Sequence, residues 1–193
     1  MKPFQGVDYF EFDSLLSDEE RMIREEVRRF VEQEAKPVIE QHHREGTFPR
    51  HLIRPMGAMG LLGANLSGYE LPGLGGAAYG LIMQELERGD SGLRSFASVQ
   101  GALVMYPIHA FGSEAQKTHW LPRLASGEAV GCFGLTEPDF GSNPGGMTTR
   151  ADARDGGYVL NGAKMWITNG DLADVAVVFA KLDGEVAGFL VEK

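Results

Sequence analysis

Cysteine is almost absent from this sequence, since Cys132 is the single one in 193 residues. A disulfide within the chain is therefore excluded, which is typical of proteins from a reducing compartment. An excess of positive charge is also lacking, because 27 acidic residues outnumber 18 Lys and Arg and leave a formal net charge of −9. This balance argues against a general nucleic-acid binder, since little would neutralise a run of phosphates. A small anionic ligand remains compatible with it, because one local cation or a few backbone N–H groups can hold such a ligand.

Long hydrophobic runs and targeting signals are missing too. The stretch 91–112 has the fewest charges, but it contains Arg94, Gln100 and His109 besides several Gly and Ser residues. A membrane span needs about 20 predominantly apolar residues, so we expect a buried helix here. The N-terminal MKPFQGVDYFEFD has neither a hydrophobic signal region nor an Arg-rich transit pattern. We therefore expect a cytoplasmic protein, or a mitochondrial matrix protein whose targeting segment has been removed.

The spacing of apolar residues divides the chain into two parts. A capping-box sequence at Ser17 precedes apolar residues at three- and four-residue steps, which predicts an amphipathic helix that Pro37 ends or kinks. More helices are expected over 49–63, 77–89, 91–112 and 113–127, the last with a capping box at Ser113. Strands are expected in AVGCFGL, on both sides of Asn161-Gly162, and on both sides of an Asp-Gly turn near residue 183.

This order of elements predicts an α+β fold. An N-terminal all-helical domain, residues 1–126, would precede an antiparallel β domain, residues 127–193. The sequence stops directly after a strand, and a few strands make a poor independent sheet. We therefore expect the β domain to be incomplete.

Several familiar motifs fail on context. GLGGAA at 73–78 fits a dinucleotide loop, but neither a buried strand before it nor an acid about 20 residues beyond it is apparent, so a plain loop before a helix is favoured. His42, His43 and His51 lack Cys or carboxylate partners at ligand spacing, which predicts surface histidines and no metal site. The sequence has no P-loop, no G-x-S-x-G elbow and no C-x-x-C pair.

Arg94 is the single formal charge between residues 91 and 112. A buried guanidinium needs an anion or a route to water, and on a helix Arg94 shares a face with Ser91, Ser95 and Ser98. Two interpretations stay open from the residues alone. Arg94 forms a structural pair with Glu87 or Asp90, or its planar fork holds a ligand carboxylate.

The segment GCFGLTEPDFGSNPGG, residues 131–146, ends an apolar run in a loop of turn residues and small hydroxyls. Such a loop would point N–H groups and the hydroxyls of Thr136 and Ser142 into one concavity, which suits an anion or the polar edge of a ring. Trp166 and Thr168, at the end of the next predicted strand, would suit a flat heteroaromatic cofactor. The alternative is a core tryptophan and ordinary strand ends.

Together, CFGLTEPDFGSNPGGMTTRA and GAKMWITNG resemble the two signature segments of the acyl-CoA dehydrogenase family, and the resemblance covers nearly the whole chain. Within the family, ELERGDSGLRSFASVQGALVMYPIHAFGSEAQK is most similar to the branch that acts on glutaryl-CoA. The resemblance implies a helical N-terminal domain, a middle β domain and a C-terminal helical bundle, with FAD between the domains.

The resemblance also implies site residues. The flavin-binding positions would be Phe133, Leu135, Thr136, Gly141, Ser142, Trp166, Ile167 and Thr168. The acyl-CoA positions would be Glu87, Arg94, Ser95, Ser98 and Ser142, with Arg94 receiving the distal carboxylate of a glutaryl chain.

The chemistry implied by the resemblance is oxidation of the acyl chain by FAD, then loss of CO2 to give crotonyl-CoA, as in lysine and tryptophan degradation. Electrons would pass to an electron-transferring flavoprotein, and the enzyme would be a homotetramer. Two departures stand out: Asn143 replaces the usual Asp, and nothing corresponds to the C-terminal bundle with its catalytic glutamate. We therefore expect no catalytic base in this chain, no turnover by the chain alone, and weak or no retention of FAD.

Overall fold

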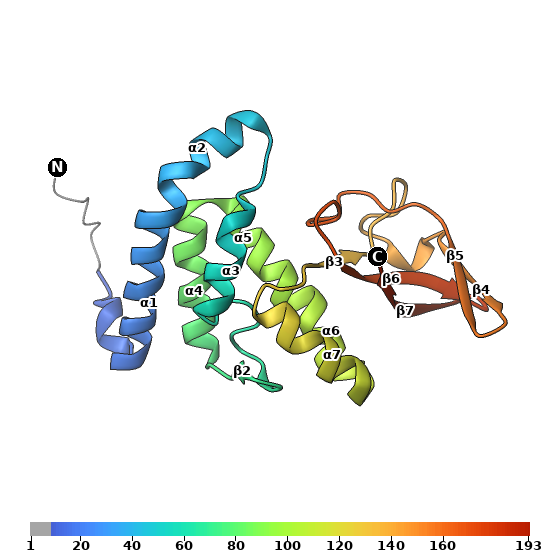
Figure 1. Ribbon diagram of the computed structural model, residues 1–193, viewed down its shortest axis with the longest axis horizontal. Helices are drawn as coiled ribbons and strands as arrows, with labels where there is room; N and C mark the ends of the chain where they lie inside the picture. Colours follow the sequence, from blue (N-terminus) through green and yellow to red (C-terminus); the bar gives the residue numbers. More distant parts are fainter. Residues whose placement is uncertain (1–8) are drawn as a thin grey trace.

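The computed structural model describes residues 9–193. Residues 1–8, which contribute to the argument on targeting, lie outside the described part. The molecule is elongated, with helices towards the N-terminal end and strands at the other end (Figure 1). No helix in the described range has both the length and the apolar character that a membrane crossing requires.

The first half of the chain is helical, as predicted. Its α-helices are α1 (Asp18–Phe30), α2 (Lys36–Glu45), α3 (Ile53–Ala58), α4 (Gly76–Gly89), α5 (Ser91–Ser98), α6 (Tyr106–Phe111) and α7 (Glu114–Ala125). Both predicted capping boxes are confirmed, Ser17 with Glu20 and Ser113 with Gln116. Each box satisfies N–H groups at the helix start that have no partner within the helix. A hairpin of two-residue strands, β1 (Ser67–Gly68) and β2 (Leu71–Pro72), interrupts the helices.

Two of the prolines within helices lie just after a π-helical segment. Pro37 and Pro107 are the second residues of α2 and α6, and each helix directly follows a π-helical segment, Val31–Ala35 or Val99–Met105. A proline ring clashes with the carbonyl four residues earlier, and the wider π turn moves that carbonyl away. Pro37 therefore does not end the first helix, because the chain stays helical to Glu45.

The second half forms a sheet of five strands within the described residues. They are β3 (Gly131–Gly134), β4 (Arg150–Arg154), β5 (Gly157–Asn161), β6 (Val175–Leu182) and β7 (Glu185–Glu192). The α+β fold is confirmed, but the sheet is mixed and not wholly antiparallel. β3 and β4 both run parallel to β6, whereas β4–β5 and β6–β7 are antiparallel hairpins. A long excursion of the chain separates β3 from β6, which allows the parallel pairing.

The two predicted hairpin turns have different outcomes. The Asp183-Gly184 turn between β6 and β7 is confirmed, with positive φ of 51° and 89° at its two residues, as a type I′ turn requires. The turn predicted at Asn161-Gly162 is wrong, because β5 ends there and residues 162–174 contain no strand. The hairpin lies earlier, at Asp155-Gly156 between β4 and β5.

A close backbone contact explains the glycine at position 162. A Cβ atom there would lie 2.6 Å from the Cα of Thr149, a backbone atom that cannot rotate away. The Asn-Gly sequence therefore marks a near approach of two segments and not a hairpin turn.

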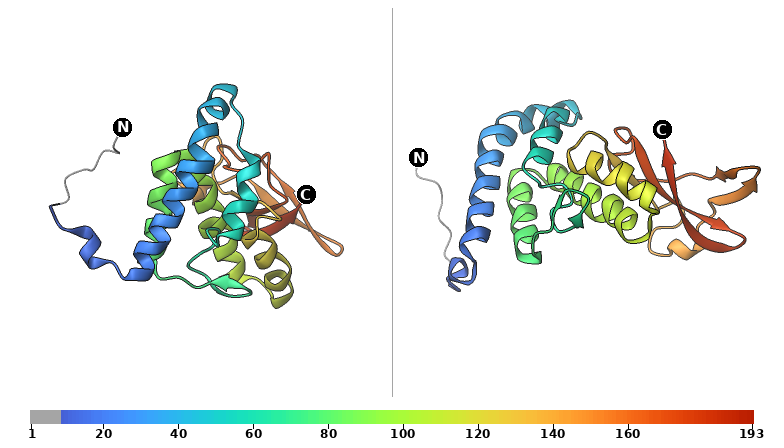
Figure 2. Two further views of the ribbon diagram at one scale, coloured as in Figure 1. Left: turned by 60° about the vertical axis from the view of Figure 1, so that its left-hand side comes forward. Right: turned by 60° about the horizontal axis from the view of Figure 1, so that its bottom comes forward.

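Two hydrophobic clusters hold the molecule together. The first joins α1, α3, α4 and α5, and the second joins α6 and α7 to β3 and β6. The views in Figure 2 accordingly place α6 and α7 beside the strands. Gly131 in β3 lies against Val104, where a Cβ atom would be 2.9 Å from a valine methyl carbon. The helical part and the sheet therefore share packed side chains.

Candidate functional site

The two signature segments lie side by side in the structure. Residues 135–149 follow β3 and residues 162–174 precede β6. The N–H of Met165 donates to the carbonyl of Thr136 at 2.9 Å, and Lys164 Nζ donates to the carbonyl of Leu135 at 3.1 Å. The hydrogen bonds thus bring predicted site residues from both segments to one place.

Glu137 lies at the centre of this contact and is only 3% exposed. Its carboxylate accepts hydrogen bonds from the backbone N–H groups of Thr148 at 2.7 Å and Thr149 at 2.9 Å, and from Lys164 Nζ at 2.9 Å. Burial alone would raise the pKa of Glu137, but hydrogen bonds from Thr149, Thr148 and Lys164 outweigh it and hold the pKa far below its ordinary value. Glu137 is therefore ionised and fully engaged. The sequence showed it only as an acid in a loop.

Trp166 projects from this contact into solvent. The residue is 85% exposed, and its backbone is in the left-handed region with φ of 60°. The alternative of a core tryptophan is therefore wrong; Trp120, at 4% exposure, fills that role. Thr168 is exposed and Ile167 half-buried. These residues lie in a loop, and not in or at the end of the predicted strand.

Asn169 anchors the other end of this loop. Its residue is 8% exposed, with φ of 67°, and its Nδ2 donates to the carbonyl of Gly131 in β3 at 3.2 Å. No sequence motif singled out this residue.

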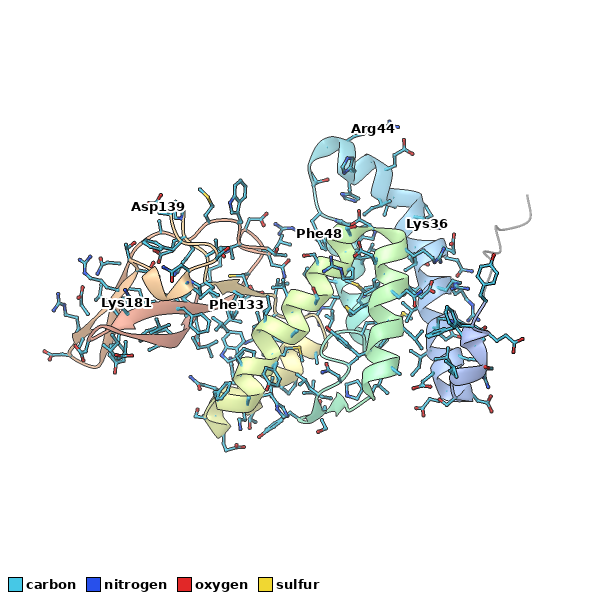
Figure 3. All side chains as sticks on the ribbon, turned by 180° about the vertical axis from the view of Figure 1, so that it is seen from behind. Lys36, Arg44, Phe48, Phe133, Asp139 and Lys181 are labelled. Atoms are coloured by element: carbon cyan, nitrogen blue, oxygen red, sulfur yellow. The ribbon has the colours of Figure 1, made fainter. Side chains whose placement is uncertain are left out.

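The remaining predicted flavin-binding residues lie along β3 and the loop after it. Phe133 and Leu135 are half-buried, as is Thr136, whereas Gly141 and Ser142 are exposed. In Figure 3, Phe133 lies towards the helices and Asp139 lies at the outer edge of the β part. The loop thus presents backbone and hydroxyl groups to solvent beside Trp166.

Arg94 forms an ion pair at the start of α5. Its Nε donates to Glu87 Oε2 at 2.6 Å, and its Nη1 donates to Ser98 Oγ at 3.3 Å. Asp90 instead caps α5 by accepting from the N–H of Leu93. The structural pair with Glu87 is therefore present. The arginine side chain is 35% exposed, so its guanidinium remains accessible to a ligand.

The polar face around Arg94 is held in a fixed arrangement. Ser91 Oγ donates to the other carboxylate oxygen of Glu87 at 2.6 Å, and Ser98 Oγ donates to the carbonyl of Ser95 at 3.1 Å. Hydrogen bonds from Ser91 and Arg94 lower the pKa of Glu87. The predicted acyl-binding residues 87, 94, 95 and 98 thus form one continuous patch.

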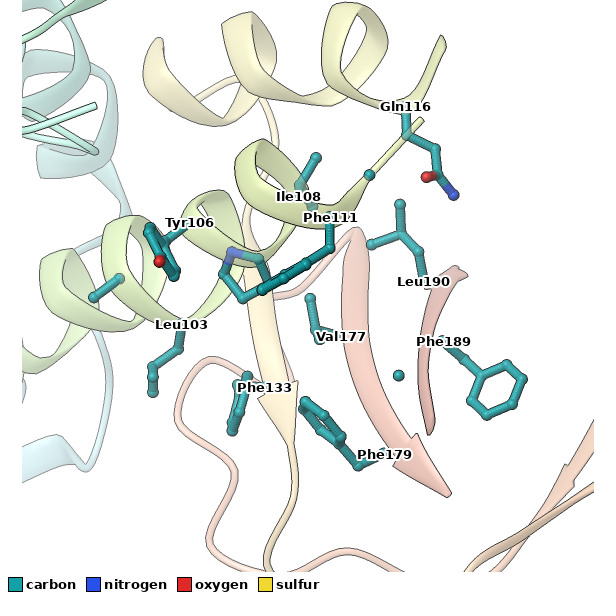
Figure 4. A pocket seen from close by; sticks show the side chains of 14 residues that line it. Leu103, Tyr106, Ile108, Phe111, Gln116, Phe133, Val177, Phe179, Phe189 and Leu190 are labelled. Atoms are coloured by element: carbon teal, nitrogen blue, oxygen red, sulfur yellow. The ribbon is translucent and has the colours of Figure 1, made fainter. Parts of the chain in front are cut away.

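An apolar cavity of about 510 Å³ lies between α6 and the sheet (Figure 4). Ring and aliphatic side chains from both sides line it, among them Leu103, Tyr106, Phe111, Phe133, Phe179 and Leu190. Neither Arg94 nor Trp166 lines this cavity. The sequence also leads us to predict that Arg94 and Trp166 face one shared cleft, and this stays a prediction.

No group of three or more His, Cys, Asp or Glu side chains suited to a metal ion is found between residues 9 and 193. The rings of His42 and His51 approach to 6.0 Å between centroids, without a third partner of that kind.

The chain is an α+β protein in which a helical domain precedes a β-sheet domain. Two family models match the chain accordingly: the N-terminal domain of acyl-CoA dehydrogenases over residues 17–128 and the middle domain over residues 132–193. The chain belongs to the acyl-CoA dehydrogenase family.

Individual relatives agree with the family. Human mitochondrial short-chain specific acyl-CoA dehydrogenase is 39% identical over 87% of this chain and 41% of its own length. Glutaryl-CoA dehydrogenase from Mycobacterium smegmatis, solved in complex with FADH2, is 54% identical with a TM-score of 0.92, over 95% of this chain and 47% of that one. A glutaryl-CoA dehydrogenase complex with glutaryl-CoA is 34% identical with a TM-score of 0.88, over 96% and 48%. This chain therefore spans less than half the length of these relatives.

Proposed function

We propose that this chain supplies the helical and middle parts of an FAD-dependent glutaryl-CoA dehydrogenase. Glutaryl-CoA would be oxidised and decarboxylated to crotonyl-CoA and CO2, with the electrons passing to an electron-transferring flavoprotein. The observation that carries the substrate class is Arg94, a half-buried cation on a polar helix face. The 54% identity to the Mycobacterium smegmatis glutaryl-CoA dehydrogenase supports the same assignment.

The residues beside Trp166 fit a flavin. Trp166 is 85% exposed, which is unusual for so large an apolar side chain on the surface of a monomer. Its indole offers a flat apolar face to a ring system. Thr168, in the segment with Trp166, and Ser142, in the loop after β3, are also exposed. We propose that Phe133, Leu135, Thr136 and Gly141 bind through their backbone or hydroxyl groups, and that Ile167 flanks the ring. FAD supplies the capacity to accept a hydride from the substrate.

The role of Arg94 follows from its surroundings. A guanidinium fork binds a carboxylate through two parallel hydrogen bonds, and Ser95 and Ser98 supply short polar groups on the same face. Since Glu87 already neutralises part of the charge, the arginine would hold a substrate carboxylate without excessive affinity. This matters because the carboxylate must leave as neutral CO2. We assign no catalytic base to these residues.

A dehydrogenase for another short-chain acyl-CoA is the alternative that a specific observation favours. The human short-chain enzyme is 39% identical over most of this chain. In that case Arg94 would serve only its structural pair with Glu87. A binding module without catalysis is the second alternative.

The test compares two arginines that differ in position but are similar in exposure and in their pairing with a glutamate. Arg94 and Arg123 have side chains 35% and 37% exposed, and each pairs with a glutamate, Glu87 or Glu128. In the complete polypeptide, Arg94→Met should lower kcat/KM for glutaryl-CoA by about 30-fold or more, since loss of a desolvated charge pair costs about 2–5 kcal/mol, and change butyryl-CoA turnover little. Arg123→Met should affect neither substrate. An equal loss on both substrates, or no loss on glutaryl-CoA, refutes the assignment.

Three further proposals rest on the family resemblance. We propose a domain boundary between residues 126 and 127, a homotetrameric assembly, and a cytoplasmic or mitochondrial matrix location. Sedimentation of the complete polypeptide tests the tetramer.

A further inference from the structure

Three backbone groups, from Leu135, Thr148 and Thr149, converge on the pair of Glu137 and Lys164. The carboxylate accepts from Thr148 and Thr149, on the far side of the loop that begins at Leu135. The ammonium of Lys164, whose side chain is 12% exposed, donates both to Glu137 and to the carbonyl of Leu135. The pair therefore closes the loop 135–149 on itself and also ties it to residue 164.

The segment with Trp166 is held at both ends. Lys164 and Met165 bind the loop after β3, and Asn169 binds the carbonyl of Gly131 within β3. Asn169 has a positive φ that asparagine tolerates. Between the anchors, Trp166 adopts a left-handed backbone conformation with φ of 60°, which is unfavourable for a large side chain. The indole gains little from burial to offset that strain, because it is 85% exposed. The buried polar contacts hold the conformation.

We propose that the Glu137–Lys164 pair is a positioning device that assembles the two sides of the flavin site before the cofactor binds. It fixes the loop with Thr136 and Ser142 against the segment with Trp166 and Thr168. This inference rests on the proposed function, because it assigns both segments to FAD. Neither Glu137 nor Lys164 is a catalytic residue; each acts through the segments it joins.

The helical domain offers a matched control. Glu85 is also buried, at 0% exposure, and accepts from Arg28 Nε at 3.0 Å and Arg88 Nε at 2.8 Å. It joins α1 to α4 and touches neither signature segment. Glu85→Gln therefore perturbs a buried ion pair of the same kind at a distance from the proposed flavin site.

The experiment measures FAD affinity and amide hydrogen exchange in the complete polypeptide, as wild type, Glu137→Gln, Lys164→Met, the double variant and Glu85→Gln. Glu137→Gln should weaken FAD binding at least tenfold. It should also speed exchange in peptides covering 147–149 and 164–169 in the cofactor-free protein. The double variant should lose no more affinity than the worse single variant, since the pair acts as a unit. Glu85→Gln should change FAD affinity less than twofold and speed exchange in α1 and α4.

Each outcome decides something different. Faster exchange in Glu137→Gln with unchanged FAD affinity overturns the positioning role and leaves a purely structural pair. An equal loss of affinity in Glu85→Gln overturns it too, because general destabilisation then explains the effect. A wild type that binds no FAD refutes the proposed function and this inference with it. If Glu137→Gln does not fold, Glu137→Asp keeps the charge but shortens its reach, and unchanged FAD affinity in that variant together with Lys164→Met overturns the proposal.

Discussion

Replacing Gln100 with methionine should destabilise the contact between the helices and the sheet. Gln100 is fully buried, and its Nε2 donates to the carbonyls of Leu124 at 2.9 Å and Ala129 at 2.8 Å. Its Oε1 accepts from the N–H of Gly131 at 2.8 Å. Methionine has a similar length and fits the space, but it removes all three hydrogen bonds. The carbonyl of Leu124 keeps a bond from the N–H of Gly127 at 3.2 Å, whereas the carbonyl of Ala129 and the N–H of Gly131 lose the partner that Gln100 supplies.

The magnitude follows from the two groups that lose their partner. A buried polar group that loses its partner costs about 1–3 kcal/mol, and partial relaxation lowers the sum, so we expect a loss of about 2–4 kcal/mol. That is a large part of the roughly 5–15 kcal/mol by which folded domains are stable. Gln100→Glu should be no milder, because it places an oxygen against two carbonyl oxygens.

Urea unfolding of the 193-residue chain, followed by circular dichroism, measures the change. Gln84→Met is the control, since Gln84 is exposed on α4 and its replacement should alter stability by less than about 0.5 kcal/mol. A loss below about 1 kcal/mol for Gln100→Met would refute the reasoning. It would mean that water or backbone movement satisfies the carbonyl of Ala129 and the N–H of Gly131.

Three further outcomes follow from the site. Acid should destabilise the chain through Glu137. The pKa of Glu137 is depressed in the folded state, so its contribution to the free energy of unfolding is complete above its ordinary pKa of 4.5 and is lost as the pH falls below that value. Glu137→Gln should flatten this part of a stability–pH profile. Gly162→Ala should cost about 1–3 kcal/mol in urea unfolding, because the new methyl group would overlap Thr149, whereas Gly157→Ala, with open space around it, should be nearly neutral. Trp166→Ala should change the stability of the cofactor-free 193-residue chain by less than about 0.5 kcal/mol because the residue is 85% exposed. In the complete polypeptide the same change should lower FAD affinity, measured by flavin fluorescence.

Local signals in the sequence predicted the helices well. Capping boxes at Ser17 and Ser113 marked helix starts correctly because a cap depends on residues three positions apart. Pro37 was predicted to end or kink the first helix, but the chain continues as a helix beyond it, because a π turn just before Pro37 accommodates its ring. Propensity alone cannot show where a helix widens.

The hairpin turns show the limit of local rules. Asp183-Gly184 and Asn161-Gly162 have equally good turn sequences, but only the first joins strands. The difference lies in Thr149, which is distant in sequence and packs against Gly162. The parallel pairing of β3 with β6 has the same origin, since it depends on a contact between segments about 40 residues apart.

The candidate site was predictable as far as surface chemistry goes. Motifs and the family resemblance singled out Trp166 and Arg94, which project polar or aromatic groups outward. Glu137, Lys164 and Asn169 lie inside the two signature segments, but we assigned no role to them from the sequence, because their roles appear only when the two loops meet. The partners of such supporting residues come from other segments, so the motif alone does not show what they hold together.

Gly131 connects the two halves of the proposed site through its own backbone N–H and carbonyl groups. Its N–H donates to Gln100, six residues beyond Arg94 along the same helical stretch, and its carbonyl accepts from Asn169, three residues beyond Trp166. A larger residue at 131 would collide with Val104, so the strand could not approach the helix closely enough for the first bond. The relative position of Arg94 and Trp166 therefore depends in part on two buried hydrogen bonds to one glycine. A change at Gln100 should consequently disturb the Trp166 segment as well, although the two side chains have no hydrogen bond to each other.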